Sequence, residues 1–181
     1  MTITLRRATL KDIGSMLSLI NRYAANGIML PRTEFELAAS VREFVIAFSG
    51  DAMVGCGALH SYTPAEAEVR SLAVDPACKS SGIGRAIVDA LLDEARRNEL
   101  DSVFAFTYAP GFFEKLGFER ATGDELPLKT WKDCIRCPKY ACCDETPMLK
   151  RLNEAERRPF GEMSHLLWPL AAFTSSRRRA E

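Results

Sequence analysis

Apolar and polar positions follow two different periods along this chain. Apolar residues recur at helical spacing over 13–20 and 83–95, close to the i, i+4, i+7 pattern that gives a helix one buried face. Apolar stretches of strand length lie over 44–48, 53–62 and 69–74, bounded by polar, glycine or proline residues. Strands and helices mixed in this way predict one α/β (α+β) domain.

Capping and turn residues indicate where these elements begin and end. Asp12 is placed to cap the first helix, and Asn26-Gly27 to end it. The run Ser49-Gly50-Asp51 is typical of a hairpin between two strands. The remaining predicted elements are a strand over Ile3–Arg7, a helix over 34–41, a strand over 103–108, a short helix over 112–116 and a strand from Phe118.

The stretch from Glu68 to Ala95 carries the clearest functional signal. A buried strand turns at Asp75-Pro76 and leads through the loop Lys79-Ser80-Ser81-Gly82-Ile83-Gly84 into a helix that reaches about Asn98. The first N–H groups of a helix have no partner inside it, and the helix dipole adds partial positive charge there. The sequence therefore predicts an anion site suited to a phosphate or pyrophosphate.

Two familiar phosphate loops do not match this stretch. A Rossmann fingerprint needs three glycines directly after the first strand, whereas this loop holds two and lies in the middle of the chain. A P-loop ends in Lys-Ser or Lys-Thr, whereas Gly84 is followed by Arg85-Ala86.

The loop instead resembles the pyrophosphate loop Q/R-x-x-G-x-G/A of the GNAT acetyltransferase superfamily, with Lys79 at the Q/R position. The preceding strand, 72–76, and the later segment 112–118 resemble the other signatures of that superfamily, the second often written F-Y-x-x-x-G-F. The resemblance covers about residues 3–120. It implies a central, mixed, mostly antiparallel twisted sheet flanked by helices, with acetyl-CoA in a cleft between splayed strands.

The resemblance also implies which residues hold acetyl-CoA. The pyrophosphate would lie on the amides of the loop, and the backbone near the end of the core strand would pair with the pantetheine. These predicted contacts are Leu72, Ala73, Val74, Lys79, Ser80, Ser81, Gly82, Ile83, Gly84 and Arg85.

Composition supports one ordinary globular domain. The chain has 181 residues, 47% apolar and 27% charged, with a formal net charge of zero. Nothing in this balance indicates nucleic acid or a membrane surface as a partner, and no apolar run is long enough to span a bilayer. The N-terminus has no signal-peptide core, so we expect a cytoplasmic protein whose six cysteines are not a disulfide framework.

Acetylation of an amine requires a base for the amine, stabilisation of an oxyanion and a proton for the leaving thiolate. Glu68 is the predicted base, because Ala67-Glu68 followed by Ala73-Val74 resembles the glutamate-base pattern of the superfamily. Strand alternation puts Glu68 and Arg70 on one face. A surface ion pair at a strand end is the alternative interpretation.

The acid is less directly indicated. Phe113 stands where the superfamily often has its proton-donating tyrosine, and a phenyl ring cannot donate a proton. Tyr108, at the end of the preceding strand, is the predicted substitute. The alternatives are that Tyr108 is an aromatic wall of the cleft, or that water or the proton released by the amine protonates the thiolate.

A closer resemblance points to the acceptor. The chain resembles the acetyltransferase domain of bacterial N-acetylglutamate synthase in segments 27–37, 42–45, 54–59 and 125–129. As a whole it resembles the short form of that enzyme, which consists of this domain alone. The resemblance implies glutamate as the small-molecule amine substrate, in arginine biosynthesis. Glutamate has two carboxylates, which arginine binds well. The candidate substrate ligands are, in order, Arg32, Arg70 and Lys129.

Other functions stay open at this point. The same fold is compatible with a different acceptor amine, on another amino acid, a polyamine or a protein terminus. A homodimer is also possible. A non-catalytic acyl-CoA-binding sensor is the alternative from a different class. It predicts tight CoA binding without turnover.

A cysteine-rich segment, 131–145, lies near the end of the predicted domain over 1–150. Thiolates at Cys134, Cys137 and Cys143 are candidate zinc ligands, although zinc prefers four. Reduced loop thiols and a redox-active pair are the alternatives. Residues 151–181 form a predicted C-terminal extension with a frayed basic end.

Overall fold

The computed structural model describes residues 2–79, 81–126, 129, 134, 137, 139 and 142–153. Its helices are α1 (Ile13–Ala24), α2 (Glu34–Ser40), α3 (Ile83–Arg97) and α4 (Pro110–Glu114), with 3-10 turns at Leu10–Asp12, Val41–Glu43, Pro76–Cys78 and Gly123–Glu125. Its strands are β1 (Ile3–Arg7), β2 (Phe44–Ser49), β3 (Ala52–Ser61), β4 (Glu66–Val74), β5 (Ser102–Thr107), β6 (Glu119–Arg120) and β7 (Thr146–Arg151).

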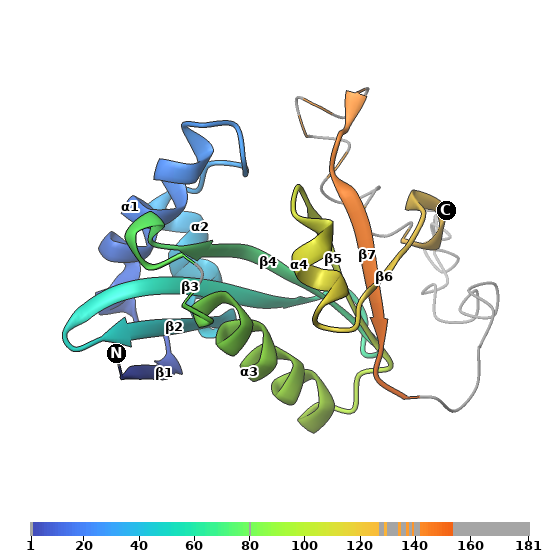
Figure 1. Cartoon of the computed structure of the whole chain (residues 1–181), viewed down its shortest axis with the longest axis horizontal. Helices are drawn as coiled ribbons and strands as arrows, with labels where there is room; N and C mark the ends of the chain where they lie inside the picture. The colour runs from blue at the N-terminus through green and yellow to red at the C-terminus, as the bar shows by residue number, and fades with distance from the viewer. Residues whose placement is uncertain are drawn as a thin grey trace, which may run out of the picture.

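The strands form one seven-stranded sheet in the order β1-β2-β3-β4-β5-β7-β6. Among the described strands β4 and β5 run parallel, and every other neighbouring pair is antiparallel. Figure 1 shows the twist of this sheet, with α1 and α2 on one side and α3 on the other. The mixed, mostly antiparallel sheet flanked by helices confirms the predicted fold class.

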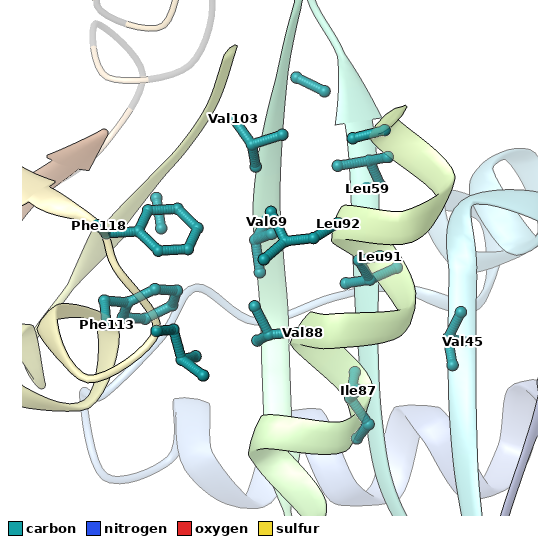
Figure 2. Close-up of a cluster of buried hydrophobic side chains, with 14 of the residues drawn as sticks. Val45, Leu59, Val69, Ile87, Val88, Leu91, Leu92, Val103, Phe113 and Phe118 are labelled. Carbon is teal, nitrogen blue, oxygen red and sulfur yellow. The ribbon is translucent and has the colours of Figure 1, made fainter. Parts of the chain in front are cut away.

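Alternation along the strands divides the core into two clusters. Phe44 and Ile46 of β2 pack with α1 and α2, whereas Val45 and Ala47 pack with α3. Figure 2 shows the second cluster, in which Ile87, Val88 and the leucines of α3 lie over the sheet beside Phe113 and Phe118. The sheet is therefore buried on both faces, which fixes the register of its central strands.

Two glycines of β3 let α3 lie close to the sheet. A Cβ at Gly55 would lie 2.9 Å from Ile87 Cδ1, and one at Gly57 would lie 2.8 Å from Ile87 Cγ2. Both distances are shorter than carbon atoms tolerate, so a larger residue at either position forces the Ile87 side chain or α3 itself to shift.

The predicted elements are confirmed with small shifts at their ends, apart from two differences. The Asp12 side chain does not cap α1; it accepts hydrogen bonds from Thr9 N and Thr9 Oγ and pairs with Arg6. The Arg6 hydrogen bond holds the pKa of Asp12 well below its usual range. Strand β7 was not predicted at all. The predicted extension lies, from residue 154 onward, outside the described residues.

Candidate active site

A cleft opens where β4 and β5 part. These strands pair over three positions, from Glu66 opposite Ser102 to Glu68 opposite Phe104, while β5 goes on pairing with β7 as far as Thr107. A cavity of about 470 Å³ lies at this divergence, within the size range of small-ligand sites. Among its lining residues are Arg32, Glu68, Arg70, Leu72, Val74, Phe106, Tyr108, Lys129 and Glu145.

A β-bulge shapes the β4 wall of the cleft. Cys56 of β3 lies opposite Ala73 and Ala58 lies opposite Arg70, so Gly57 faces two residues of β4. Ser71, in the bulge, has φ +52°, a conformation that non-glycine residues seldom adopt. A bulge interrupts the ladder, and it presents this part of the β4 backbone at the cleft. Sequence periodicity gave no sign of it.

Glu68 lines the cleft and is 3% exposed. Its Oε2 accepts a hydrogen bond from Tyr62 Oη at 3.0 Å and one from Lys129 Nζ at 3.1 Å, and Lys129 Nζ lies 3.0 Å from Oε1. Lys129, predicted as a substrate ligand, therefore pairs with the predicted base. Tyr62 was not a candidate, because only the register of β3 against β4 brings it to Glu68.

Two arginines, Arg32 and Arg70, line the cleft. Arg32 Nη2 lies 3.5 Å from Ser71 Oγ, and Arg70 Nη2 lies 3.3 Å from Glu43 Oε2. Glu43 also contacts His60 Nδ1 at 2.9 Å. Burial raises the pKa of Glu43, but the His60 hydrogen bond and the charges of His60 and Arg70 outweigh this, so the pKa lies below its usual value. The structure thus brings Arg32, Arg70 and Glu68 to one cavity.

Tyr108 forms part of the opposite wall. Its hydroxyl donates to Asp144 Oδ1 at 2.9 Å and accepts from Lys139 Nζ at 2.9 Å. The Lys139 hydrogen bond lowers the pKa of Tyr108, but burial and the Asp144 hydrogen bond raise it by more. Glu145, which sequence reasoning missed, also lines the cleft, and burial raises the pKa of its carboxyl group. Tyr108 is therefore a neutral phenol whose proton points to Asp144.

The predicted anion loop lies at the start of α3. Gly82 is its N-cap residue with φ +80°, and no side chain caps the helix. The first N–H groups of α3 are therefore placed for an anion. The loop adjoins the cleft, because a Cβ at Gly84 would lie 3.6 Å from Val74 Cγ2, and Lys79 Nζ lies 5.3 Å from the ring centre of Tyr23. Ser80 lies outside the described residues.

The other predicted acetyl-CoA contacts lie on β4, in the loop and in the first turn of α3. The side chain of Ile83 is buried in the core. On the surface of α3, Arg85 Nε lies 3.5 Å from Asp89 Oδ2. Ala73 is 2% exposed, packs toward α1 and α2 and, unlike Leu72 and Val74, is not among the residues that line the cavity. Ser81 is exposed beside Gly82.

Replacing Gly82 with alanine should weaken acetyl-CoA binding about tenfold. A Cβ at φ +80° costs about 1–2 kcal/mol, so the loop shifts and its amides lose their alignment. Isothermal titration with acetyl-CoA measures the change. Gly14→Ala is the matched control, because Gly14 has an ordinary φ and open space around it. Unchanged affinity in Gly82→Ala would contradict the assignment of this loop.

The structure gives no support to the predicted zinc site. Among the described residues, no group of three or more His, Cys, Asp or Glu side chains is arranged to hold a metal ion, whereas structural zinc needs four converging ligands. Burial raises the pKa of the Cys134 thiol, and Cys143 is exposed. Cys134, Cys137 and Cys143 are free thiols in this structure.

The splayed β4–β5 pair and the uncapped start of α3 give the cleft and the helix start that the resemblance to GNAT acetyltransferases implies. A comparison with protein families agrees: the Acetyltransferase (GNAT) family matches residues 15–118. The chain belongs to this family and is an acyltransferase. Within the part of the chain that the structure describes, no helix has the length and apolarity to cross a bilayer.

Individual relatives are similar over most of the chain. An uncharacterised N-acetyltransferase of Chlorobaculum tepidum is 38% identical over 150 residues, which are 81% of this chain and 95% of that protein. An amino-acid acetyltransferase of Mycobacterium tuberculosis is 37% identical over 72% of this chain and 76% of its own length. N-acetylglutamate synthase of Neisseria gonorrhoeae, solved with coenzyme A and N-acetyl-glutamate, superposes with a TM-score of 0.77 at 27% identity, over 84% of this chain and 36% of that one.

Proposed function

We propose that this protein transfers the acetyl group of acetyl-CoA to the α-amine of an amino acid, and that L-glutamate is the acceptor. With glutamate the reaction would be the first step of arginine biosynthesis, in the cytoplasm. The observation that most directly supports this proposal is that Glu68, Arg32 and Arg70 line one cavity. A carboxylate that accepts a proton and arginines that bind a carboxylate are what an amino-acid acceptor needs.

The residues present fit acetyl-CoA. The uncapped start of α3 offers N–H donors to a pyrophosphate, and Leu72 and Val74 on β4 line the cleft beside it. Acetyl-CoA supplies the acetyl group already activated as a thioester. The relatives named as amino-acid acetyltransferases, and the synthase solved with coenzyme A, support the same co-substrate.

Glu68 takes the proton from the acceptor ammonium in this proposal. Tyr62 and Lys129 hold its carboxylate in one orientation through contacts of 3.0 Å and 3.1 Å. A fixed carboxylate loses little entropy when it meets the amine. Arg32 and Arg70 hold the acceptor carboxylates, so that the amine is turned toward β4. Tyr108, whose proton is donated to Asp144, acts as a wall of the acceptor site, and the leaving thiolate would take its proton from water.

The direct test is turnover with each amino acid in turn. Purified protein and acetyl-CoA are incubated with the acceptor, and released thiol is followed. We expect the highest kcat/KM with glutamate. Higher turnover with another amino acid would keep the chemistry and replace the acceptor. Acetyl-CoA binding without turnover on any amino acid would contradict the proposal and favour a peptide amine or an acyl-CoA sensor.

Arg32→Ala should raise the KM for the acceptor about 10- to 100-fold and leave kcat nearly unchanged, because a hydrogen bond to a charged group contributes about 1.5–3 kcal/mol. Steady-state kinetics with acceptor varied at saturating acetyl-CoA measure this. Arg42→Ala is the matched control, since Arg42 is exposed and does not line the cavity. An unchanged acceptor KM in Arg32→Ala would remove Arg32 from the acceptor site.

A further inference from the structure

Asn21, on α1, makes two hydrogen bonds to the backbone of a single residue. Its Nδ2 donates to Arg32 O at 2.9 Å, and its Oδ1 accepts from Arg32 N at 2.8 Å. The backbone N–H can only donate and the carbonyl can only accept, so the orientation of the amide is determined by its partners. The side-chain amide of Asn21 therefore makes the two hydrogen bonds to the Arg32 backbone that a residue of a neighbouring β-strand would make.

This pairing occurs where the chain has no regular structure of its own. Arg32 belongs to the irregular connector between α1 and α2, which runs from Ala25 to Thr33. The next residue, Thr33, is the N-cap of α2, and its hydroxyl accepts a hydrogen bond from Glu36 N in a capping box. Arg32 is thus fixed from both sides, by the side chain of Asn21 and by the start of α2, while the rest of the connector has exposed apolar residues such as Ile28 and Leu30.

The fixed backbone determines where the Arg32 guanidinium lies. Its Nη2 is 3.5 Å from Ser71 Oγ, at the bulge of β4. Asn21 itself does not line the cavity, whereas Arg32, Ser71 and Glu68 do. The two bonds to Arg32 therefore link the Asn21 side chain directly to a residue that lines the cavity.

We propose that Asn21 is a positioning residue for the acceptor carboxylate, acting by holding the backbone of Arg32. This inference rests on the proposed function, in which Arg32 binds that carboxylate. A long arginine side chain reaches one place reliably only if its backbone is held, and a misplacement of about 1 Å at a binding group can cost as much as about 100-fold.

The test is Asn21→Ala in the full chain, with glutamate and acetyl-CoA varied separately. We expect the acceptor KM to rise about tenfold, with kcat and the KM for acetyl-CoA within about twofold of the parent. Asn26→Ala is the matched control: Asn26, close by in the chain, donates to Arg22 O and has no bond to Arg32. An unchanged acceptor KM in Asn21→Ala would overturn the proposal.

A double-variant cycle separates positioning from a general loss of structure. In an Arg32→Ala background, Asn21→Ala should leave the acceptor KM within about twofold, because no guanidinium remains to be placed. A further tenfold rise in that background would overturn the proposal. If Asn21→Ala does not fold, Asn21→Asp replaces it: the carboxylate still accepts from Arg32 N–H but cannot donate to Arg32 O, so the acceptor KM should again rise.

The cycle also distinguishes the two proposals. If Arg32→Ala alone has no effect, the proposed role of Arg32 in the acceptor site fails. If Arg32→Ala raises the acceptor KM and both Asn21 variants do not, only the positioning role fails.

Discussion

Glu68→Gln should lower kcat by about two to four orders of magnitude, the contribution typical of a general base. Glutamine has nearly the shape of glutamate and still accepts the hydrogen bond from Tyr62 Oη, which lies 3.0 Å from Glu68 Oε2. It cannot take a proton from the acceptor ammonium at neutral pH. The loss should therefore appear in kcat, while the affinity for acetyl-CoA stays within about twofold of the parent. Thiol release and isothermal titration measure the two quantities.

Glu66→Gln is the matched control for this prediction. Glu66 lies two residues earlier on β4, accepts a hydrogen bond from Ser102 Oγ at 3.4 Å and does not line the cavity, so its replacement should leave kcat unchanged.

Burial raises the pKa of Glu66, so the free energy of unfolding falls as the pH rises from the ordinary glutamate pKa through that raised pKa. Glu66→Gln should then raise the Tm at neutral pH and have less effect in acid. A kcat for Glu68→Gln within tenfold of the parent would contradict the base assignment.

The sequence was sufficient to predict features that depend on neighbours along the chain. Helical spacing located α1 and α3, and strand alternation correctly placed Glu68 and Arg70 at the same cavity. These patterns are local, so one sequence contains them. The start of α3 was recognisable for the same reason, because a glycine loop followed by a periodic helix is contiguous.

Features that depend on pairing between distant segments were not predicted. Strand β7 has a proline at its second position, and it becomes a strand by pairing with β5. The contacts of Glu43 with Arg70 and of Asn21 with Arg32 join residues 27 and 11 positions apart. The bulge at Ser71 depends on the register of β3 against β4. Each requires knowledge of how separate segments pair or pack, including strand register, which residue types alone do not specify.

Lys129→Met should lower the free energy of unfolding by about 3 kcal/mol, which is the usual cost of removing one partner from a buried ion pair. Lys129 Nζ lies 3.0 Å from Glu68 Oε1, and the two side chains are 14% and 4% exposed. Without the Lys129 ammonium, the buried Glu68 carboxylate keeps its hydrogen bond from Tyr62 Oη but loses its positively charged partner. For a chain of this size, a loss of about 3 kcal/mol lowers the Tm by about 6–12 °C, which calorimetry resolves.

The double variant Lys129→Met, Glu68→Gln should recover most of that loss, because no charge is then left buried without a partner. Lys115→Met, at an exposed lysine after α4, is the control for the introduction of methionine and should leave the Tm unchanged. The two roles of Lys129 predict different results. An ion-pair partner of Glu68 gives a lower Tm that the double variant restores. A ligand for the acceptor alone gives an unchanged Tm and a higher acceptor KM, and that result would contradict the pairing of Lys129 with the base.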